Sequence, residues 1–107
     1  MNYTAVLEAL RQATDFELFR LRAAIDRALG DPHRVTATRR RVHRGQRVEY
    51  FDPRTNRLHQ GLVLEMRNST VIVQDAERIL PLQLDYAALN LDAADAAIRE
   101  RGSVSGN

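Results

Sequence analysis

The sequence predicts an α+β fold: an N-terminal helix or helical hairpin, then a small five-stranded antiparallel barrel, then a short C-terminal helix. Two changes of pattern predict it. Apolar residues recur at helical spacing over residues 3–29 and at strand spacing over residues 46–75, and an Ala-rich stretch follows Leu91. We expect four parts: the helical segment 1–31, the barrel 32–91, the helix 92–101 and a disordered tail 102–107.

The large apolar residues of the first segment are spaced three or four apart, as on one face of a helix. These residues are Leu7, Leu10, Leu18, Leu21, Ile25 and Leu29, with Thr14 in the gap. The pattern ends at Gly30, which we expect in the left-handed conformation of a residue after a helix, and Pro32 separately prevents the helix from continuing.

Phe16 and Phe19 lie off this apolar face, and on a continuous helix Phe16 falls opposite Leu7. A capping box between Thr14 and Glu17 would account for them, because the helix then restarts there and the phenylalanines become core. An unbroken helix whose far face is covered by a second subunit or another protein would also account for them. The third possibility is an exposed phenylalanine of no consequence. Phe16 and Phe19 are therefore candidate partner-binding residues, and a homodimer is a candidate assembly.

The middle of the chain alternates apolar and polar residues in short stretches joined by polar turns. Three such stretches are QRVEYFD, RLHQGLVLEM and STVIVQD, and a fourth strand is expected near RILPLQ. DYAALNL is expected to form a helical turn and a last short strand. Five short strands with small connections close most economically into a barrel, since closure removes exposed sheet edges.

Within this region a glycine precedes a strand with the pattern V-x-Y/F, and after a polar turn a second glycine opens the pattern G-x-V. The residues are Gly45, Val48, Tyr50, Gly61 and Val63. The stretch resembles the small SH3-like barrels of the Tudor and KOW type, which implies a domain that binds nucleic acid or peptide motifs. An aromatic cage for methylated residues is not expected, because Tyr50 and Phe51 are adjacent in a strand and point to opposite faces, leaving Tyr86 as the other nearby aromatic.

Positive charge is concentrated in residues 32–60, which hold eight Arg, two acids and all three His, whereas the whole chain carries only +2. We expect residues 39–42 to lead into the first strand and the barrel to bring these cations to one side, with Tyr50 or Phe51 at the rim to stack a base. The predicted nucleic-acid-binding residues, for RNA or DNA, are Arg39, Arg40, Arg41, Arg44, Arg47, Arg54, Arg57 and Tyr50.

The positive charge of this segment is also compatible with roles that involve no nucleic acid. The arginines can be solvated, protect sheet edges, or pair with the acidic C-terminal part, and an acidic protein surface is another candidate partner. Our leading expectation is a non-enzymatic, nucleic-acid-associated binding module. The alternative is a protein-interaction or assembly module that uses the N-terminal helix.

Catalytic and metal-binding patterns are not found. There is no Cys, and His33, His43 and His59 lack the spacing of a zinc or metalloprotease motif. Neither a phosphate-cradling glycine loop nor a nucleophile elbow can be drawn. We therefore expect no enzyme, no metal and no cofactor. The N-terminus MNYTAVLEAL does not follow the pattern of a secretory leader, and no apolar run is long enough to span a membrane, so we expect a cytoplasmic protein without a membrane partner.

Overall fold

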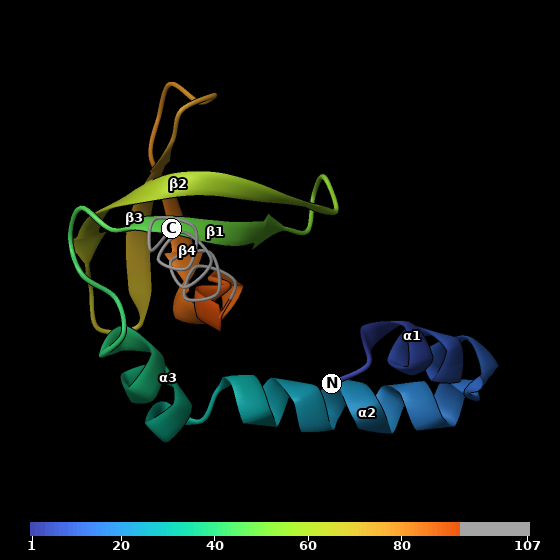
Figure 1. The fold of residues 1–107 in the computed structure, drawn as a ribbon. Coiled ribbons are helices and arrows are strands. Elements are labelled where there is room, and N and C mark those ends of the chain that lie inside the picture. Colours follow the sequence, from blue (N-terminus) through green and yellow to red (C-terminus); the bar gives the residue numbers. More distant parts are fainter. Residues whose placement is uncertain (93–107) are drawn as a thin grey trace, which may run out of the picture. The chain divides into compact units, whose positions relative to one another are not determined.

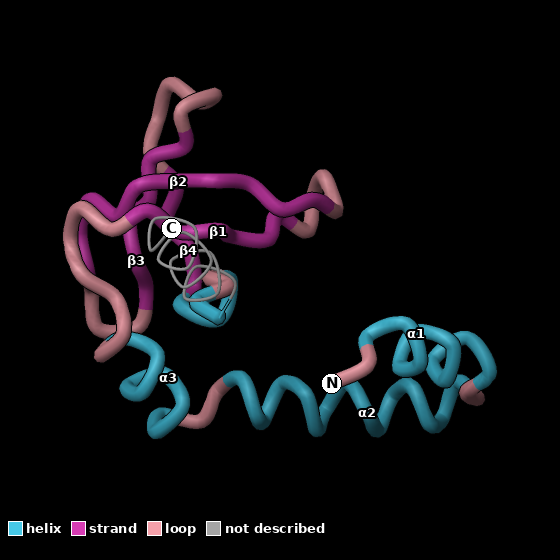
Figure 2. Tube along the Cα trace, in the orientation of Figure 1, coloured by secondary structure: helices cyan, strands magenta, loops and turns pink. Residues whose placement is uncertain are grey.

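The computed structural model describes residues 1–92. The chain divides into two compact units, Met1–Arg34 and Val35–Asn107, which are described in turn. Along the chain the helices come first and the strands follow (Figure 1, Figure 2). The α+β class is confirmed. The predicted C-terminal helix, after its first residue Asp92, and the predicted tail lie outside the described residues.

The first unit contains two helices, α1 (Tyr3–Gln12) and α2 (Asp15–Leu29), separated by a break at Thr14. The break is the predicted capping box. The Thr14 hydroxyl accepts a hydrogen bond from the backbone N–H of Glu17 at 3.1 Å, and the Glu17 carboxylate accepts one from the backbone N–H of Thr14 at 2.9 Å. The hairpin form of the prediction is therefore confirmed, and the unbroken helix is wrong.

The expectation that a break would bury the phenylalanines is wrong. Phe16 and Phe19 remain 69% and 64% exposed, and neither α1 nor α2 contains a buried residue. The guanidinium of Arg20 lies 5.9 Å from the ring centroid of Phe16, and that of Arg22 lies 5.4 Å from that of Phe19. Two helices alone do not enclose a core, so redirecting α2 leaves both rings at the surface.

A third helix, α3 (Pro32–Arg39), occupies a segment that the sequence pattern assigned to the barrel. Proline is favoured at the first helical position, and the Asp31 carboxylate accepts a hydrogen bond from the backbone N–H of His33 at 2.9 Å. Pro32 therefore begins this helix as well as following the end of α2. Gly30 has φ −83°, so the expected left-handed conformation is wrong.

The second unit is built on an antiparallel sheet in the order β1-β2-β3-β4, curled into a half-barrel (Figure 1). Its strands are β1 (Arg47–Asp52), β2 (Arg57–Met66), β3 (Thr70–Asp75) and β4 (Leu82–Asp85). A register shift in β2 between Val63 and Glu65 bends the sheet, as bulges do.

The five-stranded prediction is wrong for the described residues. The helical turn expected after β4 is present as a short 3-10 helix, η1 (Tyr86–Ala88). In place of a fifth strand the chain makes one bridge, between Leu89 and Tyr50, and the backbone N–H of Asn90 donates to the carbonyl of Glu49 at 2.8 Å. The segment after η1 thus returns to β1 but is hydrogen-bonded there over too short a length to form a strand.

The core lies on one face of this sheet. It follows the alternation predicted for β1 and β3, while β2 contributes Val63 and exposes Leu58 and Leu62 on its other face. The buried apolar residues are Val42, Val48, Tyr50, Val63, Val71, Val73, Tyr86, Leu89 and Leu91. Gly61 lies against this core, and a Cβ added there would be 2.3 Å from Cγ1 of Val73.

Candidate functional site

The main electrostatic feature of the second unit is the segment from Arg39 to Arg47, here called the basic turn. It joins the end of α3 to the first residue of β1 and contains five arginines and no acidic residue. The prediction that residues 39–42 lead directly into a strand is wrong, because Arg39 ends a helix and β1 begins only at Arg47.

Hydrogen bonds and one buried side chain order the basic turn. Val42 is 5% exposed and anchors the segment in the core. The backbone N–H of Gly45 donates to the carbonyl of Val63 at 2.8 Å, and the N–H of Val63 donates back to Gln46 at 2.9 Å. Gly45 has φ +81°, a conformation that side-chain-bearing residues rarely adopt. The exposed arginines therefore project from a fixed backbone.

The arginines of the basic turn differ in their partners. Arg39 donates to the backbone carbonyl of Asn68, in the turn between β2 and β3, and Arg41 forms an ion pair with Asp92 at 3.1 Å. The other three form no ion pair with any residue in the range 1–92, and all three are exposed: Arg40, Arg44 and Arg47. These three are available to an external anion.

Arg54 and Arg57 do not join this group. They lie in and after the turn between β1 and β2, where Asp52 pairs with Arg57 across the strands, whereas Arg47 begins β1. Five steps along a strand separate Arg47 from Asp52 by about 17 Å. Arg54 also contacts the Asp52 carboxylate at 3.4 Å. The eight predicted residues therefore do not form one face.

Tyr50 does not lie at the rim. It is 1% exposed, and its hydroxyl donates to the Asp75 carboxylate at 2.6 Å, while the ring of His59 stacks on it at 5.5 Å between centroids. Burial, followed by this hydrogen bond, raises the pKa of Tyr50 to about 12. Tyr50 is thus a core residue that cannot stack a base, whereas Phe51 faces the other side of β1 and is 39% exposed, as the strand alternation predicted.

One cation near the basic turn is not predicted from the sequence. Arg67 directly follows β2 and precedes Asn68, whose carbonyl accepts from Arg39. Its guanidinium lies 3.6 Å from the Glu65 carboxylate, and both side chains are half exposed. No sequence signal shows that the turn between β2 and β3 lies beside the end of α3, because that proximity depends on the pairing of distant segments.

Two further observations limit the chemistry within residues 1–92. No group of three or more His, Cys, Asp or Glu side chains is placed there to hold a metal ion. No helix of that part of the chain has the length and apolar character needed to cross a membrane.

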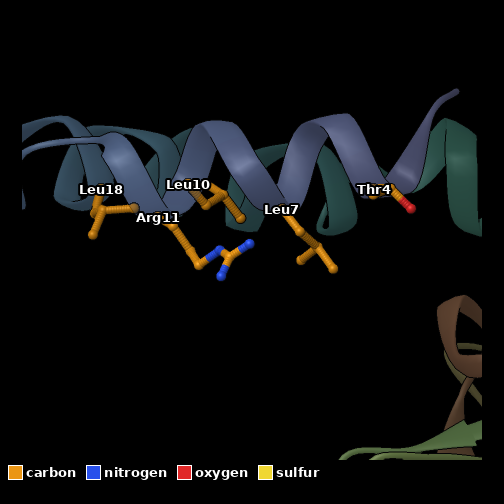
Figure 3. A pocket seen from close by; sticks show the side chains of 5 residues that line it. All are labelled: Thr4, Leu7, Leu10, Arg11 and Leu18. Atoms are coloured by element: carbon orange, nitrogen blue, oxygen red, sulfur yellow. The ribbon is translucent and has the colours of Figure 1, made fainter.

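The first unit presents a different kind of surface. Figure 3 shows Leu7, Leu10 and Leu18 directed to the same side of the hairpin, and with Thr4 and Arg11 they line an open apolar groove. Phe19 and Leu18 line a second shallow depression with Asp15 and Arg22. Both predicted partner-binding residues, Phe16 and Phe19, are accessible in this unit.

Comparisons of the chain with models of protein families, with curated proteins and with solved structures found no match. The function is therefore proposed from the geometry of the chain.

Proposed function

We propose that this protein is a non-enzymatic nucleic-acid-binding module whose basic turn contacts backbone phosphates. The observation that carries the proposal is the ordered, acid-free turn from Arg39 to Arg47, in which Arg40, Arg44 and Arg47 have no acidic partner among residues 1–92. Guanidinium groups bind phosphate oxygens through two parallel hydrogen bonds, and several such groups close together select a polyanion over a single anion.

Order in the basic turn favours binding. Because Val42 and the backbone hydrogen bonds of Gly45 hold the segment in place, contact with phosphate orders only the arginine side chains and not the backbone. Tyr50 is buried, so base stacking does not contribute through it. Phosphate contacts carry little sequence information, and we therefore propose binding that is largely independent of sequence.

The curled sheet supports a finer proposal about the fold. Four antiparallel strands in sequential order, followed by η1 and the return of Leu89 to β1, are compatible with an SH3-like barrel of the Tudor and KOW type. Gly45 and Gly61 then have defined roles in it, as a turn with positive φ and as a close approach to Val73. We place the module in the cytoplasm, with which the absence of cysteine is compatible.

The direct test compares two double variants that each remove two positive charges. Arg40→Ala with Arg44→Ala removes cations from the basic turn, whereas Arg57→Ala with Arg78→Ala removes cations elsewhere on the second unit. For a labelled oligonucleotide at about 50 mM salt, we expect the first variant to lose about tenfold or more in affinity, since two charged hydrogen bonds are lost, and the second to change little.

Two outcomes contradict this proposal. Equal losses in both double variants would show that net charge, and not the basic turn, determines binding. If the wild-type protein bound neither single-stranded nor double-stranded RNA or DNA at low salt, nucleic-acid binding would not be its function.

A further inference from the structure

The helical hairpin lacks a core of its own. Helices α1 and α2 contain 10 and 15 residues, and neither buries a side chain. Isolated helices of this length are marginally stable in water, because most helical stability in proteins comes from packing of the apolar face. A hairpin with well-formed caps at Asn2 and Thr14 but no buried face therefore needs cover from outside the unit.

Within each helix of the hairpin, large aliphatic residues are spaced three or four apart, and together these residues are here called the leucine face. It consists of Leu7, Leu10, Leu18, Leu21, Ile25 and Leu29. Leu7 and Leu10 of α1 and Leu18 of α2 point to the same side (Figure 3). Both helices thus contribute to one apolar surface. Phe19 lies beside this face on α2, and Phe16 and Ala23 lie on the far side of the helix.

The exposed apolar area matches what an association interface needs. The side chains of the leucine face that are between 37% and 54% exposed present on the order of 450 Å² of surface, which is comparable with the apolar part of the about 800 Å² that each partner buries in a standard stable interface. An exposed apolar patch of this size is often functional.

Charge on the hairpin favours a second copy of the same chain. Residues 1–31 contain four Arg and five acids, so the segment does not present one dominant sign to a strongly charged partner. In α2 the acids Asp15 and Glu17 occupy the first turn, whereas the charges of Asp26 and Arg27 cancel in the last turn. Two antiparallel copies of α2 keep the acidic first turns apart and oppose the two helix dipoles, whereas parallel copies place the acidic turns together.

We propose that the leucine face covers the leucine face of a second copy of this chain, with the two α2 helices antiparallel, so that two hairpins form a four-helix bundle. A two-fold axis makes the same surface complementary to itself, which is the commonest form of homodimer. Short-looped hairpins paired in this way are a standard route to a four-helix core. The proposal is independent of nucleic-acid binding.

The first test measures the molar mass of the full-length protein by light scattering at about 1 to 100 μM, where micromolar dimers dissociate. We expect twice the mass of one 12.2 kDa chain at high concentration. Leu21→Glu, on the leucine face, should give the mass of one chain. Ala23→Glu, which adds the same charge on the far side of α2, should leave the mass doubled.

The mass measurement overturns the proposal in three cases. These are a wild-type protein with the mass of one chain throughout the range, a Leu21→Glu variant that stays dimeric, and an Ala23→Glu variant that alone becomes monomeric. A monomeric wild-type protein would mean that another protein, or another part of this chain, covers the leucine face. A dimeric Leu21→Glu variant would place the dimer interface outside the leucine face, and a monomeric Ala23→Glu variant would place it on the side of Phe16.

A second test does not depend on how well a variant folds as a monomer. The chain has no cysteine, so a single cysteine can be introduced and oxidised to a disulfide only across the interface. In an antiparallel pair, Leu21→Cys near the middle of α2 should cross-link with its copy, and Leu29→Cys at the end should not, because Cα atoms more than about 7 Å apart cannot be bridged. Cross-linking at both positions, or at neither, contradicts the antiparallel pairing.

Discussion

Replacing Gly61 with alanine should destabilise the sheet unit by about 1–3 kcal/mol or more, which is the usual cost of overpacking a core. The added Cβ would be 2.3 Å from Cγ1 of Val73, and also 3.3 Å from the carbonyl oxygen of Gln74 and 3.5 Å from Cε1 of Tyr50. Val73 and Tyr50 are fully buried, so neither side chain can move into solvent. Small domains have little stability in reserve, and urea unfolding should show the loss directly.

The same overlap predicts a rescue. Val73→Ala removes the atom that meets the new Cβ, although by itself it leaves a cavity and destabilises the protein. We expect the double variant to be more stable than the sum of the two single effects allows, as measured by a double-mutant cycle. Strictly additive effects would show that Gly61 is not required for its packing against Val73.

Tyr50→Phe should cost about 1.5–3 kcal/mol at neutral pH, the range for a buried hydrogen bond to a charged acceptor. It removes the hydroxyl that donates to the Asp75 carboxylate at 2.6 Å. This hydrogen bond, followed by one from the backbone N–H of Glu77, holds the pKa of Asp75 below its ordinary value of 3.8. Without the Tyr50 hydroxyl, the pKa of Asp75 should rise toward that value.

The stability of the folded protein should depend on pH in acid, through Asp75, and in alkali, through Tyr50. Because the folded pKa of Asp75 is lowered, its contribution is present above its unfolded value near 3.8 and is lost as the pH falls through the folded pKa. Because the folded pKa of Tyr50 is raised to about 12, its contribution is present below 10 and is lost as the pH rises toward 12.

Thermal unfolding of the wild-type protein and Tyr50→Phe from pH 3 to pH 11 measures both effects. The difference in stability between the two proteins should be largest between the titrations of Asp75 and Tyr50 and should shrink at each end of the pH range. Burial also raises the pKa of Tyr86, so both proteins should lose some stability at alkaline pH. A difference that is constant with pH would contradict the assigned hydrogen bond.

Local patterns in the sequence correctly predict the elements whose signals are local. The capping box at Thr14 and Glu17 needs only four consecutive residues, and the inward positions Val48, Val71 and Val73 follow from strand alternation. The start of α3 is not predicted although its signal is also local, because Asp31 and Pro32 equally fit the end of the preceding helix.

Features that depend on distant contacts could not be predicted in this way. Composition alone groups Arg54 and Arg57 with the arginines of the basic turn, and only the antiparallel register of β1 and β2 separates them. The position of Arg67 depends on the turn between β2 and β3, and the burial of Tyr50 depends on its partner Asp75 in β3. Charge density therefore identifies the basic segment but not the residues that act together.

The proposed dimer has a consequence for binding. Two basic turns in one assembly can engage the same nucleic acid, and the second contact is then intramolecular, which raises the overall affinity above that of one turn. Leu21→Glu should therefore weaken binding to an oligonucleotide long enough to reach both turns more than binding to a short one, without altering any arginine.

The most direct test of the central claim is the salt dependence of nucleic-acid binding by the wild-type protein. Contacts from Arg40, Arg44 and Arg47 to three phosphates predict an affinity that falls roughly 20- to 40-fold between about 50 and 200 mM salt, for single strands and duplexes respectively. That result would support phosphate recognition by the basic turn. Binding that is unchanged over this range, or absent at 50 mM, would contradict it.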